Sequence, residues 1–165
     1  MNHRIVVDPF DSKSIDKAIA ELIRYKTWVA NKEEELRKRL ANIGAEVARI
    51  EFASAIYDGK NDVSVTVSDD GWTATILASG KAVAFIEFGS GAMYGDGHPM
   101  NAEFGTGPGT WSDGPNGKGH WDDPNGWYYA HGKKSFGNPP AMAMVHARDR
   151  MVEDVTRIAR EVFSR

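Results

Sequence analysis

The sequence predicts an α+β fold with N-terminal helices, one of them long, a small antiparallel sheet of about three to four strands, and a C-terminal helix. Three observations lead to this fold class. Apolar residues recur at helical spacing over 12–57 and 139–163, they alternate with polar residues within 62–88, and residues 89–138 follow neither period while holding 13 of the 17 glycines. At 165 residues the chain is expected to be a single domain, 1–165.

The first helix is expected to begin at Asp11, whose side chain can accept hydrogen bonds from free backbone amides. Phe10 and Ile15 occupy the two positions of a hydrophobic staple. The apolar residues that follow share one helical face, which we expect to be buried: Ile15, Ala18, Ile19, Leu22 and Ile23.

A second helix start is predicted at Asn31, because Glu34 follows three residues later as in a capping box. Such a helix would run about 40 Å to a stop at Gly59, with close packing expected at Gly44. Its stripe alternates by four and three positions, with one polar member: Leu36, Leu40, Ile43, Val47, Ile50, Ser54 and Tyr57. This stripe could pack within the subunit or contact another subunit. The candidate interface residues are Leu40, Ile43 and Val47.

A β-hairpin follows, with its turn at Asp70 and Gly71. Alternation predicts one apolar face on this hairpin, made of Val63, Val65, Val67, Trp72, Ala74 and Ile76. After a second turn at 79–81, the almost continuously apolar stretch "AVAFIEFGSG" predicts a strand covered on both faces. Glu87 interrupts this stretch, and a carboxylate buried there needs a hydrogen-bonded or cationic partner.

Residues 89–138 form a long loop rich in glycine and aromatic residues. Its aromatic side chains suit a protein interface, a sugar ring, a stacked base or a small core of their own. Three Lys against five Asp and Glu make the loop net acidic, which disfavours nucleic-acid stacking. The candidate interface residues here are Trp111, Trp121, Trp127, Tyr128 and Tyr129.

The C-terminal helix is predicted over 139–163, with Pro139 suited to its first turn. Its apolar stripe comprises Val145, Met151, Val152, Val155, Ile158, Ala159 and Val162.

No motif predicts a catalytic, cofactor-binding or metal-binding residue. Five residues could be assembled into a metal site, yet they show no familiar ligand spacing: His98, His120, Asp122, Asp123 and His131. Glu87 and Glu103 could be imagined as a glycosidase pair, but the sequence does not fix their separation. A net charge of −3 argues against tight nucleic-acid binding, and the absence of cysteine excludes disulfides and thiol nucleophiles. The sequence also lacks an apolar run of membrane-spanning length and an export signal at its start.

Two stretches resemble the tail-completion or neck (head–tail joining, minor tail component) protein family of long-tailed double-stranded DNA phages. In "VAFIEFGSG", residues 83–91, Glu87, Phe88 and Gly89 match the family's EFGT-like turn, with Ser90 where Thr is common. In "GNPPAMAMVHARDRM", residues 137–151, three residues fall on the family's helix start: Pro139, Pro140 and Ala147. The predicted order of elements is also that of the family, so the resemblance covers most of residues 12–163.

The resemblance implies a structural role without catalysis or cofactor. It implies a homo-oligomeric ring, expected to be a hexamer, in the neck or upper tail of a virion assembled in the host cytoplasm. DNA would pass through the ring without sequence-specific binding, and the partners would be other neck and tail proteins such as the stopper and tail terminator, with no membrane. Glu87, Phe88 and Gly89 would then anchor the turn from which the aromatic loop leaves. The alternative is a glycan-binding or glycan-cleaving tail accessory that uses the Trp-rich loop, and a third hypothesis is a metal-dependent nuclease.

Overall fold

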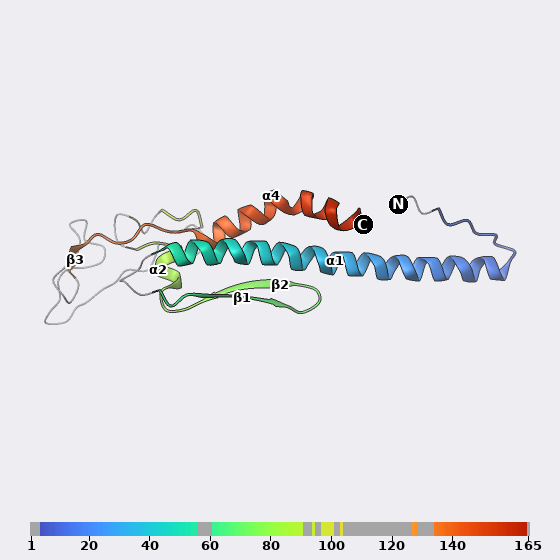
Figure 1. Ribbon diagram of the computed structural model, residues 1–165, viewed down its shortest axis with the longest axis horizontal. Coiled ribbons are helices and arrows are strands. Elements are labelled where there is room, and N and C mark those ends of the chain that lie inside the picture. The colour runs from blue at the N-terminus through green and yellow to red at the C-terminus, as the bar shows by residue number, and fades with distance from the viewer. Residues whose placement is uncertain are drawn as a thin grey trace.

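The protein is built around one long helix, with a β-hairpin on one side and a second helix on the other (Figure 1). The elements are α1 (Ser12–Ser54), β1 (Ser64–Asp69), β2 (Ala74–Ser79), α2 (Val83–Glu87), β3 (Trp127–Tyr128), β4 (Lys134–Ser135) and α4 (Ala143–Phe163). This computed structural model describes residues 4–55, 61–90, 94, 97–100, 103, 127–128 and 134–164.

Helix α1 is continuous over 43 residues, which corresponds to about 65 Å. The predicted cap at its start is confirmed, since the Asp11 carboxylate accepts the Lys13 amide at 3.0 Å. The predicted second start at Asn31 is wrong, because the helix runs through this residue. No Gly or Pro between 12 and 43 interrupts the helix, and a capping pattern alone does not break a continuing one. The staple does not form either, since Phe10 is 97% exposed.

The predicted hairpin is confirmed: β1 and β2 pair antiparallel, from Ser64 opposite Ser79 to Asp69 opposite Ala74. Its half-buried face, which turns toward α1, consists of Val63, Val65, Val67, Ala74, Ile76 and Ala78. The prediction that Trp72 belongs to this face is wrong, because Trp72 lies in the turn and is exposed. The turn is held by the Asp70 carboxylate, which accepts the amides of Trp72 and Thr73 at 2.8 and 2.6 Å.

The predicted third strand is wrong, because its central residues form the short helix α2. A short apolar run fits a buried strand and a buried helical turn equally well, so its periodicity does not decide between them. Asp62 favours the helical turn, since its carboxylate accepts the amides of Lys81 and Ala82 at 2.8 and 3.0 Å, where α2 begins. Among the described residues, the remaining strands are β3 and β4, which pair only with each other.

Helix α4 packs antiparallel along α1 between Trp28 and Glu51. Three pairs mark its course: Glu51 with His146, Arg39 with Glu161, and Trp28 with Phe163. The predicted C-terminal helix is thus confirmed, although it begins at Ala143 rather than at Pro139. Of its predicted stripe, Ile158 and Val162 are buried, whereas Val152 is exposed.

The core lies where the C-terminal end of α1, the N-terminal end of α4, α2 and the hairpin meet. Its buried members are Ala48, Phe52, Ala82, Ile86, Ala143 and Ala147. The most buried face of α1 is therefore not the predicted leucine-rich stripe but a row of small residues ending in Phe52: Ala41, Gly44, Ala45 and Ala48. At Gly44 an added Cβ would lie 2.7 Å from the Met151 sulfur and 2.8 Å from Ile76 Cδ1. Small side chains thus let α4 and β2 approach the same turn of α1.

Candidate functional site

The two ends of the long loop are tied together at what we call the loop base, residues 86–90 and 137–144. The Ser90 amide donates to the Asn138 carbonyl at 2.9 Å, and the Asn138 amide donates back at 3.2 Å. Three to four residues further into the domain, the Ala141 amide donates to the Ile86 carbonyl at 2.8 Å. The loop therefore starts and ends at one point, and residues 48 apart in sequence form a short antiparallel bridge.

Gly89 allows this close approach. Its φ of +73° lies in the left-handed region, which favours glycine. A Cβ on this residue would lie 2.7 Å from the Asn138 carbonyl oxygen and 2.8 Å from the Pro140 nitrogen, both backbone atoms. Any side chain at this position would push the two halves of the loop base apart.

Glu87 caps helix α4 from a distant part of the chain. Met142, which precedes the helix, has a φ of 55° and provides no side-chain cap. The buried Glu87 carboxylate instead accepts the Met144 amide at 3.0 Å. A carboxylate beside the first free amides of a helix is favourable because it satisfies a donor and complements the helix dipole.

His98, which is also buried, completes the cap. Its Nε2 lies 3.2 Å from Glu87 Oε1, and its Nδ1 accepts the Met100 amide at 3.1 Å. Because Nδ1 is an acceptor, the ring proton is on Nε2 and is donated to the carboxylate. The ring also packs against Phe88, with centroids 4.4 Å apart. These hydrogen bonds bring the loop residues 98–100 onto the loop base.

The hydrogen bonds of Glu87 and His98 hold the loop at its base. Both Glu87 oxygens accept hydrogen bonds from the Met144 amide or His98, so the carboxylate is already engaged. Within the described part of the chain, no three His, Asp or Glu residues are grouped so that they could hold a metal ion. The other members of the metal set considered from sequence lie outside the described residues: His120, Asp122, Asp123 and His131.

The sequence-predicted interface residues are not brought together by the described structure. Leu40, Ile43 and Val47 are half-buried on α1. Trp127 and Tyr128 form β3, of which only the backbone is described, and Trp111, Trp121 and Tyr129 lie outside the described residues.

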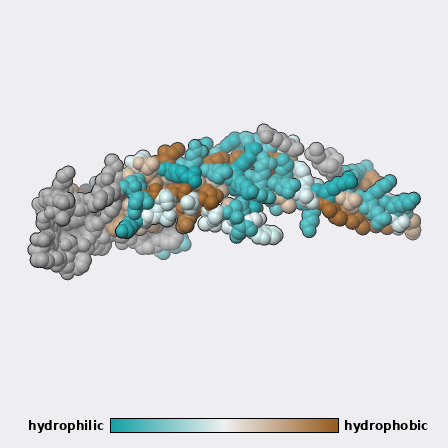
Figure 2. Space-filling model, turned by 60° about the horizontal axis from the view of Figure 1, so that its bottom comes forward, coloured by the Kyte–Doolittle hydropathy of each residue, from teal (hydrophilic) through white to brown (hydrophobic). Residues whose placement is uncertain are grey.

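A second candidate surface is the α1 arm, residues 12–27, which extends beyond both the hairpin and the end of α4 (Figure 1). The last contact of α4 is the edge-to-face pair of Phe163 with Trp28, 5.8 Å between centroids. The expectation that the first apolar face is buried is therefore wrong for most of it, since Ile19, Leu22 and Ile23 are 50, 55 and 60% exposed. Figure 2 shows this apolar patch, in brown, at the right-hand end of the molecule, where α1 projects beyond the other elements.

The apolar face of the arm is broad. At about 100° per residue, Ile15, Ala18, Ile19, Leu22, Ile23 and Tyr25 fall within an arc of about 160°. Lys26 is the one charged residue within this arc. The other charged residues of the arm occupy the opposite arc: Lys13, Asp16, Lys17, Glu21 and Arg24. The sequence pattern predicts this face. The predicted helix break at Asn31, however, gave no indication that the face lies beyond the core.

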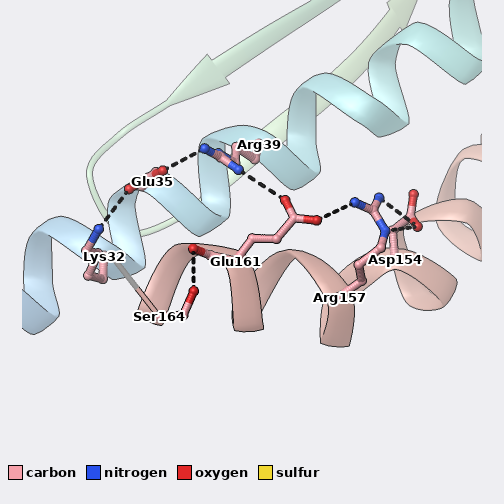
Figure 3. A network of polar contacts seen from close by, with 7 residues as sticks. All are labelled: Lys32, Glu35, Arg39, Asp154, Arg157, Glu161 and Ser164. Atoms are coloured by element: carbon pink, nitrogen blue, oxygen red, sulfur yellow. Dashed lines mark hydrogen bonds and ion pairs between the residues drawn. The ribbon is translucent and has the colours of Figure 1, made fainter. Parts of the chain in front are cut away.

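A chain of ion pairs joins the C-terminal part of α4 to α1, about two to three helical turns from the arm (Figure 3). Arg39 bridges the two helices, with nitrogens 2.9 Å from Glu35 and 3.5 Å from Glu161. Glu161 continues to Arg157 at 2.8 Å, and Arg157 pairs with Asp154 at 2.9 Å. The Arg157 hydrogen bond lowers the pKa of Asp154 below its ordinary value. These ion pairs hold α4 on α1, and the contact of Phe163 with Trp28 then ends the covered part of α1.

No protein-family model, no curated protein and no solved structure matches this chain. Among the described residues, no helix combines the length and the apolar character needed to cross a membrane.

Proposed function

We propose that this protein is a structural component of the neck or upper tail of a long-tailed double-stranded DNA phage. It self-associates into a ring, expected to be a hexamer, and docks other neck or tail proteins such as the stopper and tail terminator around the DNA channel. The observation that carries the proposal is the exposed apolar surface of the α1 arm, where Ile19, Leu22 and Ile23 are at least half exposed. Contiguous apolar surface of this kind on a folded subunit marks a site of protein contact.

The loop base supports the proposal from the other end of the molecule. The two stretches that carry the family resemblance, 83–91 and 137–151, contact each other there through main-chain hydrogen bonds and the Glu87 cap. The motif residues therefore have a physical purpose that does not require catalysis. They clamp the ends of an aromatic loop, and a clamped loop is a suitable element for contacting a neighbour.

Electron microscopy tests the proposal, both of the purified protein and of virions labelled at its C-terminus. Closed rings, together with a label at the junction of head and tail, are the expected result. A label on the tail fibres or its absence from virions would contradict the proposed location, and a protein that never forms rings would contradict the proposed assembly.

A loop deletion separates assembly from folding. Removal of residues 110–135 is expected to leave a folded subunit that does not assemble, because the loop base closes without them. If the deletion instead unfolds the subunit, the loop belongs to the core. Saturable Trp quenching by oligosaccharides with a monomeric protein would favour the glycan-binding alternative.

A further inference from the structure

We propose that the α1 arms of two copies pair antiparallel about a two-fold axis near residues 20 and 21. The partner is a second copy of this chain, and each arm covers the apolar face of the other. The inference rests on the self-association part of the proposed function. It adds an isologous contact that is distinct from the head-to-tail contacts by which a ring closes.

The area available is that of a specific interface. Five large apolar side chains of the arm are more than a third exposed: Ile15, Ile19, Leu22, Ile23 and Tyr25. Three more in the segment before the arm are also exposed: Val6, Val7 and Phe10. Together they expose on the order of 900 Å², and a standard protein interface buries about 800 Å² on each partner. A two-fold contact between identical arms matches this surface with one of the same chemistry and length.

Charge selects the antiparallel direction. Lys26 lies near the centre of the apolar arc, in the same four–three alternation as Ile15, Ile19 and Leu22. A parallel pairing in register would place Lys26 against the partner's Lys26 inside an apolar contact, which is repulsive. With Ile19 opposite the partner's Leu22, the antiparallel pairing instead places Lys26 opposite the partner's Ile15. It then lies about one helical turn from the partner's Asp11, at the start of that helix.

The same register gives the exposed Phe10 a contact. Phe10 of one arm would lie level with residue 31 of the partner, beside the aromatic cluster at the end of α4. This cluster consists of Tyr25 stacked on Trp28 at 5.7 Å and of Phe163 against Trp28 at 5.8 Å. The end of each arm would thus meet the end of the partner's covered region.

The chain contains no cysteine, so single cysteines can report the register in the full-length protein. The variants are Ile15→Cys and Lys26→Cys. In the antiparallel register these positions face each other, whereas each lies about 16 Å along the axis from its own copy, and a disulfide requires Cα atoms within about 7 Å. Mild oxidation is expected to give disulfide dimers at least about 10-fold more abundant in the mixture of the two variants than in either alone.

Dimers in each single variant would overturn the proposal in favour of parallel pairing. Unlinked protein in all three samples, with rings still visible by electron microscopy, would overturn the arm pairing and leave the proposed ring intact. If no rings form but the mixture of the two variants still cross-links, the proposed ring would be overturned and the arm pairing would stand.

Sedimentation equilibrium of two matched variants gives a second measurement that does not depend on thiol geometry. Leu22, in the arm, is 55% exposed, and Leu77, on the solvent face of β2, is 56% exposed. Leu22→Glu is expected to weaken the pairing at least about 30-fold, because a charge enters the contact twice, while Leu77→Glu leaves it unchanged. Equal association constants for Leu22→Glu and Leu77→Glu would overturn the proposal, and circular dichroism of both variants verifies that they fold.

Discussion

Gly89→Ala is expected to be the most destabilising single-methyl change at the loop base. Two effects add. An L-residue in the left-handed region costs about 1–2 kcal/mol. The new Cβ would also lie within 2.9 Å of the Asn138 carbonyl oxygen, the Pro140 nitrogen and the Pro140 ring. None of these atoms can rotate away, so the strands of the loop base must separate and their hydrogen bonds, each worth about 1 kcal/mol, must lengthen. We expect a total loss of about 3–4 kcal/mol.

Gly71→Ala is the matched control for Gly89→Ala. Gly71 also has a positive φ, +92°, but a Cβ there would meet nothing within 4 Å. This change should cost only the conformational strain, about 1–2 kcal/mol. Urea unfolding of the three proteins, followed by circular dichroism at 222 nm, measures both losses as differences in the free energy of unfolding. Equal losses for the two variants would refute the reasoning, because the contact with the Asn138 and Pro140 backbone would then contribute nothing.

Three further predictions concern the polar caps and the helix contact. Glu87→Ala leaves the Met144 amide and the His98 ring without their buried acceptor, so the free energy of unfolding should fall by about 2–4 kcal/mol in the same urea titration, and an unchanged value would disprove the capping role. The Ala82 and Lys81 amides hold the pKa of Asp62 below its ordinary 3.8, so its stabilisation is present above that pH and is lost as the pH falls through the lowered pKa; Asp62→Asn should therefore show less acid destabilisation below pH 3.8 than the parent, and parallel pH profiles would contradict this. Gly44→Ala should change stability by less than about 1 kcal/mol, because the tips of Met151 and Ile76 can move aside and Ala favours the helix; a loss as large as that of Gly89→Ala would show that this contact is rigid.

The sequence was sufficient to predict those elements whose caps and turns are formed by residues next to them in the chain. Asp11 provides the cap of α1, and Asp70 with Gly71 provides the turn of the hairpin, so both could be predicted from neighbouring residues. The long helix, the small antiparallel sheet and the C-terminal helix were predicted for the same reason.

The errors arose where a distant residue decides the local structure. The apolar run ending at Glu87 becomes a helical turn because Asp62, about twenty residues earlier, accepts its first amides. The start of α4 is likewise decided by Glu87 rather than by the prolines before it. Asp62 and Glu87 lie too far along the chain from the helices that they cap for a local sequence pattern to connect them. The loop base likewise joins Ser90 and Asn138, which are 48 residues apart and share no sequence pattern that predicts their pairing.

The buried face of α1 was missed because size, not hydrophobicity, determines which side of this helix packs most closely. Gly44, Ala45 and Ala48 allow α4 and the hairpin to approach the helix axis, whereas the larger Leu40, Ile43 and Val47 lie at the edge of the contact and remain half-buried. A search for the most hydrophobic stripe selects the larger residues.

The central claim is that a second copy completes the burial of the α1 arm, and amide hydrogen exchange tests it most directly. Exchange of residues 12–27, followed by mass spectrometry at protein concentrations from about 1 to 100 µM, reports whether the arm is covered. The account predicts that protection of these amides rises with protein concentration, while that of the core residues around Phe52 stays constant. Arm amides whose exchange does not depend on concentration would contradict it.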